Sequence, residues 1–328
     1  IILQMKAKVY PECKIHDGLF RFDDMRHATR IITILLVVGF LNCTQPSQAD
    51  GIGEENSHAI ESADTTRRVK RVPVNQFSRD SIRQRLRAKS NENELRIIHV
   101  YVPLCDNEFQ GIVPVNASLG DGTNLRTNLY WGAGYGIKTH FKRSSKWQTL
   151  GSTFNVSTNV LERVVFKHAG QNVILVADAY RGDQMESCVK DYFNTLAGLK
   201  TDTIAIGDSS IVIGSTTDLV VFNGHNGLMD VSIDTVYNVD GVLKDAVAIA
   251  CVSHSYYVDY LNKSGGYPLV MTAHLLAPEA YVLDHVLDAW INNQPAEEIR
   301  FAAAQGYHKV QKCGIRGASN LFVTGWGN

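Results

Sequence analysis

Short apolar runs that alternate with amphipathic segments constrain the fold of this chain more than any other feature. The runs are rich in β-branched residues and lack the in–out alternation of a half-exposed strand. They lie at residues 96–104, 172–180, 219–223, 246–250 and 267–275. Helical patterns separate or follow them, at residues 183–199, 255–266, 278–293 and 295–314. Strands with two apolar faces that alternate with helices predict an α/β domain, in which helices cover both faces of a mostly parallel sheet.

Two further patterns refine this prediction. Residues 160–169 resemble another strand, and a Gly-containing turn joins them to the run that begins at 172, which predicts an antiparallel edge. Residues 125–143 have helical spacing, although their glycines weaken it. In the helix predicted at 183–199, Cys188 lies off the apolar stripe that is expected to face the core.

The chain before this domain has a different character. Met25 opens a pattern of basic residues, an apolar run at 31–41 and small residues that end at Ala49, which is typical of a secretory signal peptide. We therefore expect residues 25–49 to be a signal peptide and residues 1–24 to be a non-native upstream segment. Export to the periplasm or the extracellular space follows from the signal peptide.

A lipoprotein signal at Cys43 is less favoured, because Asn42 stands where a small residue is expected before a lipidated cysteine. Residues 50–94 are polar and charged, and they are expected to be a linker or prosegment. Residues 95–328 are expected to form a single domain.

Charge and cysteine spacing argue against several classes of function. Net charge is −1, with 32 basic against 33 acidic residues, so the chain lacks the basic excess of a nucleic-acid-binding protein. None of the six cysteines forms a Cys-x-x-Cys pair, which argues against a structural zinc site. The glycines at 132–136 are not followed by Lys-Ser or Lys-Thr, so they make a poor phosphate loop. We expect no cofactor, no nucleic-acid partner and no membrane contact after signal cleavage.

Polar and reactive side chains collect where the predicted strands end. Ligands of open α/β sheets bind outside the carboxyl ends of the strands, at a switch in strand order. The residues expected at this edge are Cys105, Asp106, Asn107, Asp178, Arg181, His225, Cys251, Ser253 and His254. A site at this edge is therefore predicted.

Cys251 and His225 are the pair best suited to catalysis. A cysteine nucleophile needs a base that takes its proton and N–H donors that stabilise the oxyanion. Cys251 lies in a predicted strand-to-helix turn, where the positive end of the helix favours the thiolate. Gly224 and Gly227 allow sharp bending around His225. The N–H groups of Gly227 and Cys251 are the expected oxyanion donors.

The two strand ends resemble those of the caspase–legumain–gingipain superfamily of cysteine peptidases. Its members have an apolar strand that ends in His-Gly and a later apolar strand that ends in Ala-Cys or Ser-Cys. Here "LVVFNGH" leads to His225, and "VAIAC" places Ala250 before Cys251. The resemblance implies a caspase-like fold over residues 96–275, with His225 as the base and Cys251 as the nucleophile.

One residue departs from the superfamily pattern. Asn226 stands between His225 and Gly227, whereas the superfamily usually has glycine directly after the histidine. The segments "NLYWGAGYG" and "GHNGLMD" also resemble exported bacterial proteins of unassigned function, and that resemblance implies no activity.

These observations favour a secreted cysteine hydrolase, with an endopeptidase acting on peptide or protein substrates as the leading hypothesis. A non-enzymatic α/β binding module on the same fold and a hydrolase of small amides are the alternatives. A metal site formed by His225, His254 and Asp230 is a further alternative for the same residues.

The acids at the strand edge suggest a specificity. Asp106 and Asp178 share this edge with one cation, Arg181, and a half-buried carboxylate pairs well with Arg or Lys. We therefore expect these three residues to bind substrate and cleavage to follow a basic residue. In the alternative, Asp178 and Arg181 pair with each other, and Asp106 is a turn residue.

Overall fold

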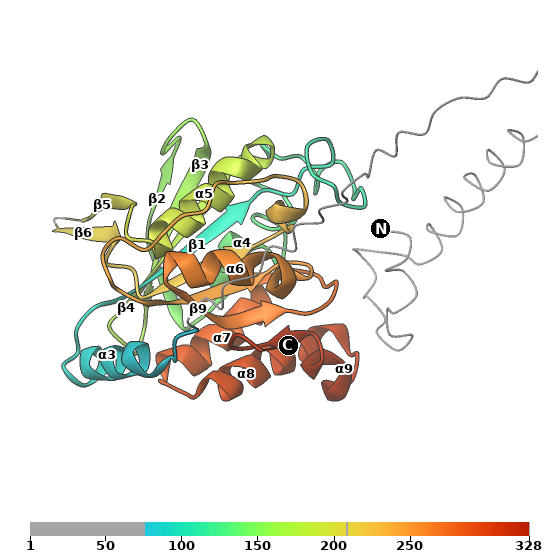
Figure 1. Cartoon of the computed structure of the whole chain (residues 1–328). Helices are drawn as coiled ribbons and strands as arrows, with labels where there is room; N and C mark the ends of the chain where they lie inside the picture. The colour runs from blue at the N-terminus through green and yellow to red at the C-terminus, as the bar shows by residue number, and fades with distance from the viewer. Residues whose placement is uncertain (1–75, 208, 328) are drawn as a thin grey trace, which may run out of the picture. The chain divides into compact units, whose positions relative to one another are not determined.

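An eight-stranded mixed sheet forms the centre of the domain. The computed structural model describes residues 76–207 and 209–327 (Figure 1). The strand order is β10-β9-β8-β7-β1-β4-β3-β2. The parallel strands are β1 (Arg96–Pro103), β4 (Val173–Tyr180), β7 (Leu219–Asn223), β8 (Lys244–Ile249) and β9 (Gly266–Thr272). Every residue of β1, β4, β7 and β8 is buried, which explains their continuous apolar runs and confirms the predicted α/β class.

Antiparallel strands extend the sheet on both sides. On one side β3 (Val160–His168) pairs with β4, and β2 (Trp147–Phe154) pairs with β3. On the other side the short β10 (Phe322–Val323) pairs with β9. The antiparallel edge at β3 was predicted. Strand β2 was not, because it lies at the sheet edge with most of its residues exposed and so lacks an apolar run.

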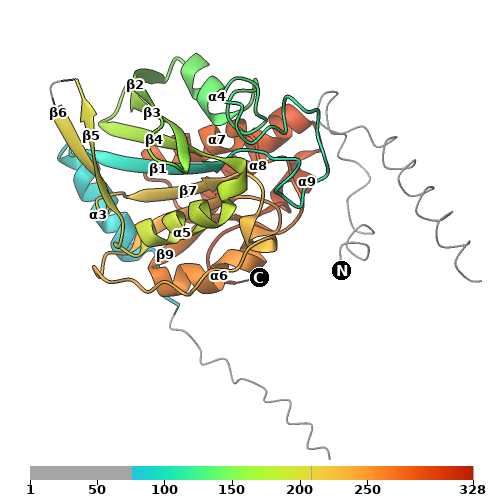
Figure 2. The same ribbon diagram turned by 90° about the horizontal axis from the view of Figure 1, so that it is seen from above.

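Helices cover both faces of the sheet (Figure 2). One face carries α5 (Met185–Leu196) and α6 (Ser253–Ser264). The other carries α4 (Ile137–Arg143), α7 (Ala280–Ile291) and α8 (Ala296–Gln311), with the short α9 (Ile315–Ser319) after α8. The helix predicted over residues 125–143 is confined to α4. The residues before it form turns, in which a Cβ at Gly136 would lie 2.4 Å from the backbone of Trp131.

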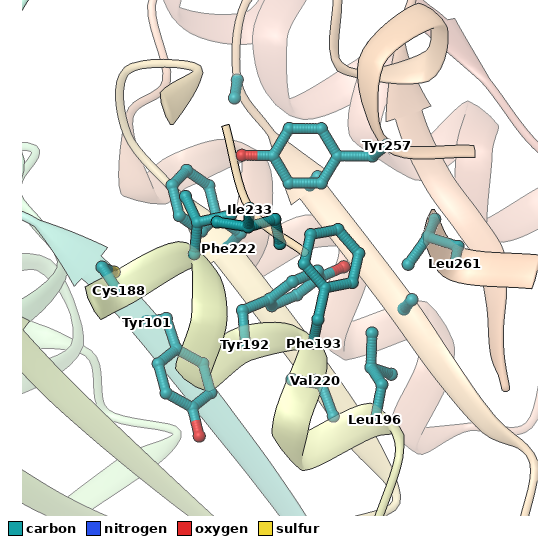
Figure 3. Packing of buried hydrophobic residues seen from close by; sticks show 14 of the residues in the cluster. Tyr101, Cys188, Tyr192, Phe193, Leu196, Val220, Phe222, Ile233, Tyr257 and Leu261 are labelled. Carbon is teal, nitrogen blue, oxygen red and sulfur yellow. The ribbon is translucent and has the colours of Figure 1, made fainter. Parts of the chain in front are cut away.

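Aromatic rings fill the core between the sheet, α5 and α6 (Figure 3). Tyr192 of α5 lies edge-on to Phe222 of β7 and Tyr257 of α6, with ring centroids 5.9 and 6.0 Å away. Cys188 is fully buried in the same cluster, so the prediction that it lies off the core face is wrong. It follows Met185 by three residues and precedes Tyr192 by four, and these spacings place all three on one helix face.

The segment expected to be a polar linker or prosegment contributes a helix to the domain. Helix α3 (Asp80–Asn91) buries Ile82 and Leu86. Just before it, Arg79 makes two hydrogen bonds to the Asp245 carboxylate in β8, at 2.8 and 2.7 Å. The helix has only two buried apolar residues, so its apolar period is too weak to be recognised in the sequence. The signal peptide, the upstream segment and residues 50–75 of the expected linker lie outside the described residues.

A two-stranded sheet was also not predicted. Strands β5 (Thr201–Ile206) and β6 (Ser209–Gly214) pair with each other and pack Ile204 and Ile213 against Ile97 and Ile174 of the main sheet. Among the helices of the described residues, none is long and apolar enough to cross a membrane.

Candidate functional site

His225 and Cys251 lie in the turns that follow two neighbouring strands, β7 and β8. These strands are parallel neighbours, and Asn223 pairs with Ile249 in their register. His225 and Cys251 each lie two residues beyond that pair. The edge is also a topological switch, because β1 has β4 on one side and β7 on the other, and α5 lies between β4 and β7 in the chain. A ligand site is expected at such a point.

Cys251 lies in a strained turn between β8 and α6. The next residue, Val252, has φ 53° and ψ 30°, which is the left-handed region that a β-branched residue rarely adopts. Backbone contacts hold it there, since the Val252 N–H donates to the His274 carbonyl at 3.1 Å. Strain that is maintained by surrounding contacts is typical of functional sites, so the turn points to a role for Cys251.

The thiol of Cys251 is partly buried and directed at the loop that follows β9. Its Sγ lies 3.5 Å from the carbonyl oxygen of Leu276 and donates to it. Burial raises the pKa of this thiol above its usual value, and backbone hydrogen bonding only partly offsets the effect. This direction is opposite to that expected from the helix N-terminus, and it favours a neutral thiol at rest.

His225 is held by a carboxylate that was not assigned this role from the sequence. Its Nε2 lies 2.8 Å from Oδ2 of Asp230, and the His225 side chain is only 7 % exposed. The same Asp230 oxygen accepts a hydrogen bond from the N–H of Gly111 at 3.0 Å. Burial opposes ionisation of Asp230, but the hydrogen bonds from His225 and Gly111 outweigh it and keep the Asp230 pKa below its usual value. A carboxylate in this position fixes the ring and leaves Nδ1 for other chemistry.

Asn226 connects the two turns. Its Nδ2 donates to the carbonyl oxygen of Cys251 at 2.7 Å, and its Oδ1 accepts from the N–H of Leu228 at 3.1 Å. The extra residue between His225 and Gly227 therefore has a structural use in this chain. Gly227 itself lies against α5, where an added Cβ would meet Met185 Sδ at 2.5 Å. Close packing, rather than the oxyanion, is what requires glycine there.

The three residues predicted to bind a basic substrate do not form one pocket. Asp178 lies inside β4 rather than after it and is completely buried. Arg163 of β3 binds its carboxylate with two hydrogen bonds, at 2.7 and 2.8 Å, and His99 Nε2 lies 3.0 Å away. Arg181 pairs with Asp183 at 2.8 Å, so the alternative in which Asp178 and Arg181 pair with each other is wrong.

Asp106 is a turn residue. Its Oδ1 accepts hydrogen bonds from the N–H groups of Glu108 and Phe109, at 2.9 and 3.2 Å. The side chain is buried within the loop that follows β1. Asn107 holds the same loop by two hydrogen bonds to the backbone of Val115. Its Nδ2 donates to the Val115 carbonyl oxygen and its Oδ1 accepts from the Val115 N–H, both at 2.9 Å.

The other candidate side chains have structural partners. Ser253 donates to the carbonyl oxygen of Ala248 at 2.7 Å. The ring of His254 is hydrogen-bonded to the backbone of Gly325, and burial lowers its pKa. Cys105 is completely buried, and burial raises its pKa to about 12.

Two residues near Cys251 were missed in the sequence. Tyr130 is buried, and both Cys251 and Glu279 act electrostatically on its hydroxyl. Glu279 is 3 % exposed on the loop after β9. Neither follows a strand directly, so a search of strand ends could not find them. Asp230 could have been found, because it follows His225 by five residues across a turn-forming Asn-Gly pair.

Within the described ranges, no group of three or more His, Cys, Asp or Glu side chains is arranged to hold a metal ion. The comparisons with known proteins add no family to this geometry. No protein-family model matches the chain, and neither a curated protein nor a solved structure matches it significantly.

Proposed function

We propose that this protein is a cysteine hydrolase, most simply an endopeptidase, in which Cys251 is the nucleophile, His225 the base and Asp230 the residue that orients the base. One observation carries the proposal: His225 and Cys251 each lie two residues beyond the paired residues Asn223 and Ile249, at the ends of the neighbouring strands β7 and β8. The strained Val252 turn and the His225–Asp230 hydrogen bond support it.

The reaction would begin from the neutral thiol. Asp230 occupies Nε2 of His225, so Nδ1 takes the proton of Cys251 as the sulfur attacks the substrate carbonyl carbon. A C–S bond forms and the carbonyl oxygen becomes an oxyanion, for which the Cys251 N–H is the proposed donor. The backbone of Gly227, the other expected donor, interacts with the buried hydroxyl of Tyr257 instead. The C–N bond then breaks, and His225 returns the proton to the leaving amine. Water cleaves the resulting thioester, with His225 taking one of its protons and passing it to the sulfur.

A raised thiol pKa is compatible with this sequence of events. Concerted proton transfer to a neighbouring imidazole does not require a stable thiolate in the resting protein. Substrate that displaces the Leu276 contact would free the sulfur for attack. Export remains part of the proposal, because its basis is the signal-peptide pattern at residues 25–49.

The test compares the parent with Cys251→Ala on a peptide library and on the proteins that the parent cleaves. We expect Cys251→Ala to lose about 10³-fold or more of kcat while its thermal unfolding changes little. Cys313→Ala is the matched control, because it removes another thiol from a buried position. A Cys251→Ala variant that keeps the parent rate would show that Cys251 is not the nucleophile.

A binding module without hydrolytic activity is the second candidate. The neutral, backbone-bound thiol of Cys251 favours it, because a dedicated nucleophile is more often activated in the resting state. A parent protein that cleaves no peptide or small amide, and that does not react with an electrophilic acyl probe at Cys251, would support this candidate instead.

A further inference from the structure

Three buried acceptor groups lie on or against the loop that follows β9, and each has little hydrogen-bond donation from the protein. Asn223 Oδ1 and Gln311 Oε1 have no hydrogen-bond partner among residues 76–207 and 209–327. Both side chains are buried, with exposed fractions of 0 % and 4 %. The third group is the buried carboxylate of Glu279. Buried acceptors without donors are costly, so their occurrence together indicates a missing donor.

The orientation of Asn223 is fixed by its other atom. Its Nδ2 donates to the carbonyl oxygen of Pro278 at 2.9 Å. A carbonyl only accepts, so the nitrogen must face Pro278 and the oxygen must be the unpartnered atom. Asn223 is also the last residue of β7, two positions before His225. The acceptor therefore belongs to the strand that carries the proposed base.

Glu279 has neutral partners. Gln311 Nε2 approaches its Oε2 at 3.5 Å, and the hydroxyl of Tyr281 also bonds to it. The same Gln311 nitrogen donates more closely to the Tyr281 hydroxyl, at 2.8 Å. A buried carboxylate is usually matched by a cation, as Asp178 is by Arg163 and Asp245 by Arg79 in this domain. Burial raises the Glu279 pKa, and a cation beside the carboxyl would favour its charged form.

The loop connects this cluster to the nucleophile. The carbonyl oxygen of Leu276 accepts a hydrogen bond from the Cys251 thiol, and that of Pro278 accepts one from Asn223. Glu279 follows Pro278 directly in the chain. Tyr130 provides a second connection, because Cys251 and Glu279 are both close enough to its hydroxyl to raise its pKa when they are ionised. A side chain bound by the cluster would extend from a backbone positioned at Cys251.

We propose that Asn223, Glu279 and Gln311 form a subsite that binds the cationic side chain of the substrate, an arginine or a lysine, beside Cys251. Guanidinium and ammonium groups donate several hydrogen bonds and carry the charge that complements Glu279. This inference rests on the proposed hydrolase function. In this subsite Glu279 takes the role that the sequence suggested for Asp178 and Asp106. The Asp178 carboxylate is already bound by Arg163 and His99, and Asp106 caps a turn.

Binding is tested without catalysis, in full-length protein carrying Cys251→Ala. Titration calorimetry with arginine amide and with citrulline amide, its neutral isostere, measures recognition of the charge. We expect arginine amide to bind more tightly by roughly 10- to 100-fold and the difference to vanish when Glu279→Gln is added. Glu298→Gln on the exposed side of α8 is the matched control and should leave the difference unchanged. Equal binding of the two amides, or a preference that survives Glu279→Gln, overturns the subsite.

Hydrolysis separates failure of the subsite from failure of the proposed function. A fluorogenic panel with Arg, Lys, citrulline, norleucine, Asp and Ala before the cleaved bond is run on the parent, Glu279→Gln and Asp106→Asn. We expect the Arg and Lys substrates alone to lose kcat/KM in Glu279→Gln and to be unaffected in Asp106→Asn. Preference for a neutral or acidic residue overturns the subsite but leaves the hydrolase intact. Selective arginine amide binding by a parent that cleaves nothing supports the subsite and contradicts the hydrolase.

Discussion

Asn226 donates a hydrogen bond of 2.7 Å to the main-chain oxygen of Cys251, so the residue after the proposed base holds the turn of the proposed nucleophile. The bond joins the turns that follow two neighbouring strands, β7 and β8. Asn226 is completely buried and also caps the short turn after it through Leu228. One side chain thereby sets the relative position of both proposed catalytic residues.

Replacement of Asn226 should affect both stability and rate. Asn226→Ala leaves the Cys251 carbonyl and the Leu228 N–H without their partners, which should cost about 1–3 kcal/mol of unfolding free energy. Asn226→Asp keeps the acceptor for Leu228 but sets a buried carboxylate oxygen against the carbonyl oxygen of Cys251, so its stability loss should be at least as large. Urea unfolding should show a stability loss in both variants, and kcat should fall clearly in both. Equal rates in Asn226→Asp and the parent would contradict a positioning role.

Loss of the Asp230 carboxylate should slow the chemical step. Asp230→Asn keeps the size of the side chain but permits the ring of His225 to adopt the other tautomer, with Nδ1 protonated and unable to act as a base. We expect kcat to fall by about 10²- to 10⁴-fold with little change in KM.

Asp234→Asn supplies the control for this experiment, because Asp234 is exposed on the same loop. It should behave as the parent. If Asp230→Asn and Asp234→Asn have the same kcat, Asp230 does not orient the base.

The apolar runs predicted the central sheet, because strands that are buried on both faces consist of continuous apolar residues. All five parallel strands were expected within a few residues of their positions, and so were α5 to α8. Strand β2 and the β5–β6 hairpin were not, because exposed edge strands have no need of continuous apolar residues. Helix α3 is anchored by the Arg79–Asp245 pair, and a long-range ion pair leaves no periodic signal.

The candidate site was predictable in its reactive residues and not in their partners. His225 and Cys251 follow apolar strands that are neighbours in the sheet, and each lies two residues beyond the last pair of their register, Asn223 and Ile249. Strand ends also suggested Asp178, but the strand continues past it and its side chain turns to Arg163 and His99. Which buried acid has a cationic partner depends on tertiary packing. Sequence position alone could therefore not show that Asp178 is paired with Arg163, whereas Glu279 has only neutral partners.

Thiol reactivity should distinguish Cys251 from the other cysteines of the described residues. Cys251 is partly exposed, whereas Cys105, Cys188 and Cys313 are buried. Iodoacetamide should therefore modify Cys251 first in the folded protein, as peptide mass mapping would show. Because burial raises the Cys251 pKa, its alkylation rate should keep rising with pH beyond about pH 9. A rate that reaches its plateau below neutral pH would indicate a preformed thiolate instead.

The buried pair of Asp178 and Arg163 should dominate the acid sensitivity of the fold. Two hydrogen bonds join them, and His99 lies against the same carboxylate from β1, while Asp202 of β5 binds the far side of Arg163 at 2.6 Å. Asp178→Asn leaves a buried guanidinium with less compensation and should cost about 3–5 kcal/mol at neutral pH.

The pH dependence of this loss has a defined sign. Burial opposes ionisation of Asp178, but Arg163 and His99 reverse the effect and hold its folded-state pKa well below the usual value. The stabilisation is therefore fully present above the unfolded-state pKa, about 3.9, and is lost as the pH falls through the folded-state pKa. Urea unfolding of the parent and Asp178→Asn should show a constant difference from pH 7 to pH 5 and a shrinking one below pH 4. Asp234→Asn should match the parent throughout, and a difference between the parent and Asp178→Asn that grows on acidification would contradict the assignment.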